Sequence, residues 1–167
     1  MDWAHIHLAI NHLPVWGILF GLLFTSVALF SKSQDLKKWS LWFVLLISVL
    51  TIPVYLTGEP AEELVEHLPG VSEAMIEKHE ESALIGTVAA VALGLIALVG
   101  ILKRIWLPER SRKLFSIFVA ANLAVAVTFA WVANLGGKIL HPEVRRSTAT
   151  ESQSLPRSEV RDDNDSD

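Results

Sequence analysis

Residues 56–82 read LTGEPAEELVEHLPGVSEAMIEKHEES, and the rest of the chain is arranged around this segment. It carries eight glutamates, two histidines and one lysine between two apolar segments. Because so acidic a segment is too costly to place in hydrocarbon, its apolar neighbours must deliver it to a membrane surface. The pattern predicts an acidic connector outside the bilayer, and it directs the search for function to that surface.

The composition indicates a small integral membrane protein. The chain has 167 residues, of which 51% are hydrophobic, and its mean hydropathy is +0.42. It contains no cysteine, which excludes disulfides, thiolate zinc sites and cysteine-ligated iron–sulfur clusters. No basic patch is interleaved with aromatic residues, so the sequence gives no support for nucleic-acid binding.

Two apolar segments precede this connector and two follow it, and each is long enough to cross a bilayer as a helix. The expected fold is all-α: an up-and-down bundle of four transmembrane helices with an amphipathic, acidic, helical connector between the second and third. The first segment lacks the basic start of a secretory signal, so we expect it to be retained. The predicted spans are residues 12–30, 39–57, 82–102 and 114–135, with the connector at 58–81. The transmembrane domain covers residues 1–144, and residues 145–167, with almost nothing to bury, are expected to be a disordered tail.

Residues at the helix ends refine these bounds. Asn11 is a suitable N-cap for the first span, although a helix that starts earlier would be kinked at Pro14. Ser72 is expected to cap a helix that runs without a break from Glu73 into the third span. The Gly136-Gly137 pair is expected to end the fourth span as a C-cap.

Two features inside the spans predict helix packing. Gly17 and Gly21 form a GxxxG pair, which allows close approach of another helix and suggests a homo-oligomer or a partner subunit. Asn122 is the central polar residue of the fourth span, and we expect it to make an interhelical hydrogen bond.

The distribution of positive charge predicts the orientation. The two short turns after the first and third spans hold most of the basic residues, whereas the N-terminus and connector together hold only Lys78. The positive-inside rule then places both turns in the cytoplasm and both termini outside. The expected location is the cytoplasmic (inner) membrane of a bacterium, with lipid as an obligatory partner. The basic residues of the turns are Lys32, Lys37, Lys38, Lys103, Arg104, Arg110, Arg112 and Lys113.

In this topology all six histidines fall on the outer side, together with the glutamates of the connector. Imidazole and carboxylate groups are ligands for divalent transition metals, and haem b takes two histidines from different helices. His12 and His79 are the best placed pair for this role, whereas His5 and His7 are expected to be interfacial and without function. The wider set of candidate ligands is His12, His67, His79, His141, Glu59, Glu63, Glu77 and Glu80.

Haem and a bare metal ion both remain open. The glutamate-rich rim would repel haem propionates and so favours a cation, whereas a four-helix membrane bundle with histidines on facing helices is a common way to hold haem. No HExxH motif and no ExxH motif of di-iron bundles is present, so the candidate ligands form a cluster rather than a motif.

The chain also resembles a bacterial family of four-helix membrane proteins classed only as a domain of unknown function. The resemblance covers roughly residues 8 to 141 and rests on His12-Leu13-Pro14, Thr57-Gly58, His79 and the run from Gly136 to Leu140. The family has His-Phe-Pro, Thr-Gly, His and Gly-Gly-x-Leu-Val at the equivalent places, so Leu13 and Leu140 depart from it, as does the glutamate-rich connector.

The resemblance implies a cytoplasmic-membrane protein of unassigned activity, and some relatives fused to redox modules point to electron transfer. It also implies that His12, His79 and the Gly136-Gly137 turn are functional positions.

Two functions follow as hypotheses. The first is a membrane protein that binds a metal or haem at the outer face and serves electron transfer with a redox protein or a larger membrane complex. The second is a non-catalytic accessory or scaffold subunit that docks a partner through the acidic connector. Neither hypothesis requires catalysis, and no catalytic residue is predicted.

Overall fold

A computed structural model describes residues 3–67, 69, 71–105 and 111–140 of the chain. Within these residues the structure is all-α, as predicted, and contains no strand. Its helices are α1 (Trp3–Ile10), α2 (His12–Phe30), α3 (Gln34–Leu56), α4 (Gly58–Val65), α5 (Glu73–Leu102) and α6 (Ser111–Leu140).

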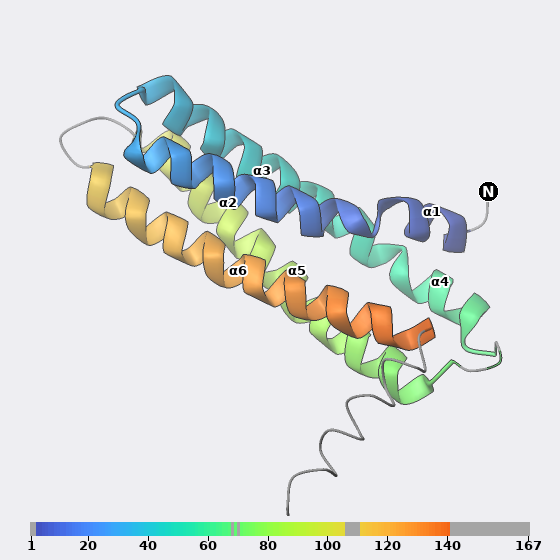
Figure 1. The fold of residues 1–167 in the computed structure, drawn as a ribbon. Helices are drawn as coiled ribbons and strands as arrows, with labels where there is room; N and C mark the ends of the chain where they lie inside the picture. The colour runs from blue at the N-terminus through green and yellow to red at the C-terminus, as the bar shows by residue number, and fades with distance from the viewer. Residues whose placement is uncertain (1–2, 68, 70, 106–110, 141–167) are drawn as a thin grey trace, which may run out of the picture.

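The four long helices α2, α3, α5 and α6 form an up-and-down bundle (Figure 1). Each packs against two neighbours, in the order α2, α3, α5, α6 and back to α2. All four are long and apolar enough to cross a membrane, and the short helices α1 and α4 extend the first two at one end. The chain is therefore a multi-pass membrane protein whose outer surface contacts lipid.

The distribution of apolar side chains supports this conclusion. Large apolar residues face outward along every long helix, among them Phe30 and Leu102, whose side chains are 78% and 71% exposed. The inner face of α5 is instead built from small residues, including Gly86, Ala90 and Gly94. A bundle in lipid gains nothing by hiding large apolar groups, so close helix contact through small residues is what holds it together.

The observed helices match most of the predicted bounds. α2 covers the predicted first span, and α5 runs without a break from Glu73 to Leu102. α3 begins earlier than predicted, at Gln34, because the Ser33 side chain accepts a hydrogen bond from the backbone N–H of Leu36. The predicted tail, residues 145–167, lies outside the described residues.

Two predicted helix ends differ from the structure. α6 continues through Gly136 and Gly137 to Leu140, because neither glycine adopts the left-handed conformation that a C-cap of this kind requires. At the other end of the chain, α1 and α2 are separated only at Asn11, whose side chain makes no capping hydrogen bond. The predicted C-cap at Gly136-Gly137 is therefore wrong, and the helical region of the N-terminus starts at Trp3.

The GxxxG pair packs α2 against α3 of the same chain. Gly17 and Gly21 are buried against α3, where a Cβ on Gly17 would lie 2.7 Å from Ile47 Cγ2 and one on Gly21 would lie 3.2 Å from Val44 Cγ2. The glycines let α2 approach α3 closely, so this face is not available to a second copy of the chain or to a partner. The expectation of an oligomer formed through Gly17 and Gly21 is corrected accordingly.

The hydrogen bond predicted for Asn122 is present. Asn122 is fully buried in α6, and its Nδ2 donates to Thr25 Oγ1 of α2 at 3.3 Å. Thr25 Oγ1 in turn donates to the Gly21 carbonyl at 2.8 Å, so a polar chain connects α6 to the backbone of α2. Asn122 Oδ1 has no hydrogen-bond partner among the described residues.

Replacement of Thr25 by valine should lower the free energy of unfolding by about 1 kcal/mol, since interhelical hydrogen bonds in membranes contribute about 0.6 to 1.7 kcal/mol. The change is nearly isosteric and leaves the buried Asn122 amide without its acceptor. Thr128→Val is the matched control, because Thr128 Oγ1 bonds only to the Ala124 carbonyl of its own helix. Reversible unfolding in mixed detergent micelles measures both variants, and an equal loss in the two would contradict an interhelical role for Thr25.

Candidate functional site

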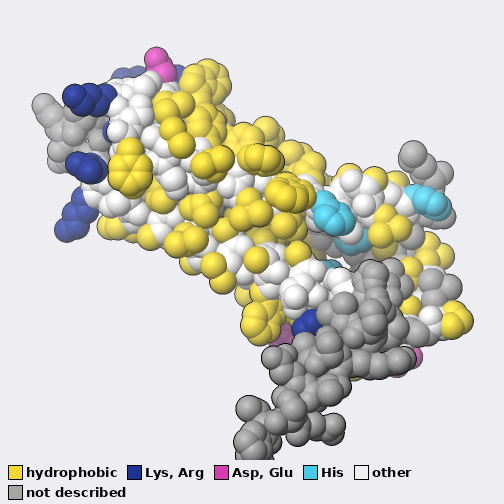
Figure 2. Space-filling view, in the orientation of Figure 1, with side chains coloured by type: hydrophobic (Ala, Val, Ile, Leu, Met, Phe, Trp, Pro, Cys, Tyr) yellow, Lys and Arg dark blue, Asp and Glu magenta, His cyan; other side chains and the backbone are white. Residues whose placement is uncertain are grey.

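The two short helices create a site at one end of the bundle. α1 packs against α4, so the N-terminal segment and the first part of the acidic connector fold together beyond the apolar helices (Figure 1). Histidine side chains gather at this end, whereas a cluster of lysine and arginine side chains occupies the opposite end (Figure 2). The separation of histidine-bearing and basic ends agrees with the arrangement that the sequence predicts.

His79 is held between α5 and α6. It is half-buried, and its Nδ1 lies 3.1 Å from the Val132 carbonyl oxygen. A carbonyl can only accept, so Nδ1 carries the proton and donates it, and Nε2 keeps its lone pair in the neutral ring. The imidazole lies directly against Gly136, where a Cβ would be 3.0 Å from Cε1. Gly136 therefore makes room for the ring.

His7 is held in a similar way by the end of α3. It is half-buried, and its Nδ1 lies 3.1 Å from Thr57 Oγ1. The Thr57 hydroxyl donates its own proton to the Val54 carbonyl at 2.8 Å, so it must accept from His7 Nδ1–H. The ring also rests on Gly58, where a Cβ would be 3.7 Å from Cε1. His7 thus has the same tautomer as His79, with the lone pair on Nε2.

The two imidazoles lie close enough for charge on His79 to act on His7. Both rings have lost part of their contact with water, and each also has a hydrogen bond to a backbone carbonyl, His7 to Val54 and His79 to Val132. Protonation of one ring therefore opposes protonation of the other, which favours two neutral imidazoles. Neutral imidazoles with their Nδ1–H groups held by the protein are the form in which histidine binds a transition metal.

The remaining predicted ligands take other positions. His12 is exposed, and its Nδ1 pairs with the side chain of its neighbour Asn11. It lies on α2, whereas His7 lies on α1, and the two helices are separated at Asn11. His7, rather than His12, is held by the end of α3 and lies within the electrostatic influence of His79.

The acidic residues of the connector do not form a metal site. Glu59, Glu63, Glu77 and Glu80 are exposed. The His67 side chain is 84% exposed and pairs with Glu66 at 3.3 Å. No three histidine, aspartate or glutamate side chains among the described residues come together in a way that could hold a metal ion, and His141 lies outside those residues.

The glutamates of α4 and of the first turns of α5 form a negative surface. Glu62 is half-buried in the field of Glu80, Glu66 and Glu59, which are drawn from both helices. Such a surface attracts cations from solution without fixing them in place.

Sequence reasoning missed His7. Its partner Thr57 is 50 residues away, and the contact exists only because α1 packs on the helix that follows Thr57. The short motifs were the available signal. Thr57-Gly58, His79 and Gly136 are three of the features that carry the family resemblance, and in the structure Thr57 and Gly58 contact His7 while Gly136 contacts His79.

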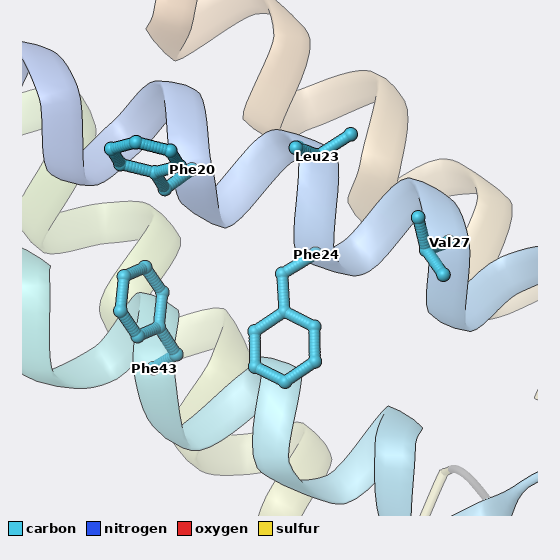
Figure 3. A pocket seen from close by; sticks show the side chains of 5 residues that line it. All are labelled: Phe20, Leu23, Phe24, Val27 and Phe43. Atoms are coloured by element: carbon cyan, nitrogen blue, oxygen red, sulfur yellow. The ribbon is translucent and has the colours of Figure 1, made fainter.

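A groove elsewhere on the bundle carries no candidate chemistry. It has a volume of about 490 Å³ and is lined by Phe20, Leu23, Phe24 and Val27 of α2 and by Phe43 of α3 (Figure 3). Phe24 and Phe43 meet edge to face, with ring centroids 6.0 Å apart. Every lining side chain is apolar, so the groove is suited to lipid chains rather than to a polar ligand.

Comparison of the chain with the models of known protein families, with characterised proteins and with solved structures finds no match.

Proposed function

We propose that this membrane protein binds a transition-metal centre through His7 and His79 and takes part in electron transfer. The observation that carries the proposal is that two half-buried imidazoles on different helices each have Nδ1–H bonded to the protein, and that they lie near enough for the charge of one to act on the other. These hydrogen bonds select the tautomer and orient the rings in advance, which is how proteins commonly prepare metal-binding histidines.

Haem iron fits the number of donors better than a bare ion does. Two imidazoles complete the axial ligand set of a haem, whereas a tetrahedral metal site needs four ligands and the described residues offer two. The glutamates around Glu62 oppose this choice, because they repel the propionates of a haem. The experiment therefore tests haem and bare metal ions separately.

The proposed location is the bacterial cytoplasmic membrane, with both termini and the histidine pair outside. The support is the cluster of basic side chains at the end of the bundle opposite the histidines (Figure 2), because positive loops stay in the cytoplasm. Membership of the four-helix family of unknown function is part of the same proposal. It is supported by the contact of Thr57-Gly58 with one half-buried histidine, His7, and of Gly136 with another, His79.

Titration of detergent-purified protein with haemin, and separately with Cu²⁺ and Zn²⁺, tests the proposal. Absorption spectra in the oxidised and dithionite-reduced states identify haem, and elemental analysis identifies metal. We expect stoichiometric binding that weakens at least tenfold in His7→Ala and in His79→Ala, since each loses one of two ligands. His67→Ala is the matched control, because His67 lies at the same end of the protein but outside the pair.

Equal binding by the wild type and both histidine variants would contradict the site. If the wild type binds neither haem nor metal, the accessory-subunit hypothesis takes precedence, and the negative surface around Glu62 becomes the place to seek a partner.

A further inference from the structure

A second groove lies between α5 and α6, at the end of the bundle that carries the histidine pair. It has a volume of about 580 Å³. Residues three or four apart line it from each helix, so one continuous face of α5 meets one continuous face of α6. The lining residues are Met75, Lys78, Glu81 and Ser82 of α5, and Trp131, Leu135 and Lys138 of α6.

This groove is separate from the histidine pair. His79 follows Lys78 directly, but it turns toward Val132 and Gly136 and does not line the groove. The groove instead opens outward, with Lys78 and Glu81 exposed and the Trp131 side chain 65% exposed.

The groove combines polar and apolar side chains. Lys78 and Lys138 contribute two ammonium groups, while Glu81 contributes a carboxylate and Ser82 a hydroxyl. Toward the middle of the bundle the same faces continue as Ile85 on α5 and Val127 on α6, which are 57% and 63% exposed to the lipid side. A tryptophan at the junction is typical of the depth at which lipid headgroups lie.

We propose that this groove binds a phospholipid whose headgroup carries a phosphate and a primary ammonium group, as in phosphatidylethanolamine. The phosphate pairs with Lys78 and Lys138, and the ammonium group donates hydrogen bonds to Glu81. The acyl chains then lie along Trp131, Ile85 and Val127. Glu81 distinguishes this headgroup from phosphatidylglycerol, which has no cation, and from phosphatidylcholine, whose quaternary ammonium has no N–H to donate.

Native mass spectrometry of the full chain in detergent, titrated with each of the three lipids, tests the proposal. We expect phosphatidylethanolamine to be retained about fivefold better than either of the other two, which is the effect of one interfacial charge contact. The double variant Lys78→Gln/Lys138→Gln should lose this retention at least fivefold. Lys32→Gln/Lys38→Gln, at the opposite end of the bundle, is the matched control and should leave it unchanged.

A third variant separates the two halves of the headgroup. Glu81→Gln should abolish the preference for phosphatidylethanolamine over phosphatidylglycerol while both lipids still bind through the lysines. Inorganic phosphate at millimolar concentration should displace none of the bound lipid. Equal retention of all three lipids, retention by the double lysine variant, or displacement by inorganic phosphate would each overturn the proposal. Circular dichroism of each variant confirms that the bundle is folded.

Discussion

Replacement of Gly94 by alanine is expected to lower the free energy of unfolding by about 2 kcal/mol. A Cβ at this position would lie 2.6 Å from Ser48 Cβ, an atom fixed to the backbone of α3 that cannot rotate away. Relief of the overlap requires α3 and α5 to move apart, and overpacking of this kind costs about 3 kcal/mol. The higher helix propensity of alanine offsets about 1 kcal/mol of that cost.

The same helix provides the control for this prediction. A Cβ on Gly86 would lie 3.5 Å from Val132 Cγ2, which is an ordinary contact, so Gly86→Ala should leave stability unchanged or raise it by up to about 1 kcal/mol. Adding Ser48→Gly to Gly94→Ala removes the clashing atom and should restore at least half of the loss. Unfolding in mixed detergent micelles measures all three. A stable Gly94→Ala protein, or a double variant no better than the single one, would show that this contact does not limit the helix spacing.

Replacement of Gly136 by valine is expected to weaken cofactor binding by 10- to 100-fold, the range found when the support of a metal-binding histidine is lost. A Cβ there would be 3.0 Å from His79 Cε1 and 3.3 Å from Nδ1, and the two extra methyl groups of valine would push the imidazole off the Val132 carbonyl. His79 would then lose both its tautomer and its orientation.

The adjacent residue is a matched control for this prediction. A Cβ on Gly137 would meet nothing within 4 Å, so Gly137→Val places the same side chain on the same helix without touching His79. Titration with haemin or Cu²⁺ measures affinity. The ¹⁵N signals of the His79 ring report the tautomer without any bound cofactor, so they test the positioning role even if the proposed function fails. Unchanged ring signals in Gly136→Val would contradict this role for Gly136.

The histidine pair and the lipid groove lie on different faces of the same helix contact. α6 supplies Val132 and Gly136 to His79, and Trp131, Leu135 and Lys138 to the groove. The groove depends on the continuation of α6 beyond Gly136, because a helix ending there would not carry Lys138 in register. Lipid in the groove would therefore rest against the helix that orients His79.

The helix that carries His79 could be predicted from the sequence, because the signals for it lie in neighbouring residues. His79 lies on the outer part of a continuous helix that begins at Glu73. That helix was predicted from its apolar run and from a cap at Ser72, whose side chain makes no capping hydrogen bond in the structure. The residues next to it could not be identified. Gly136 has the appearance of a helix stop in sequence, and only its position against the His79 ring shows that it provides space.

By itself, the sequence determined the class of structure: four apolar segments, an acidic connector that cannot enter hydrocarbon, and basic turns at the opposite end. These properties depend on composition and on short-range helix geometry, so they can be read without knowing which helix meets which. Which residues meet within the chain depends on the tertiary structure. Gly17 and Gly21 face α3 of the same chain, and His7 rather than His12 is held by Thr57 within the electrostatic influence of His79. Both outcomes depend on how α1 and α2 are rotated against helices that lie far away in sequence, and that rotation is set by the packing of the whole bundle.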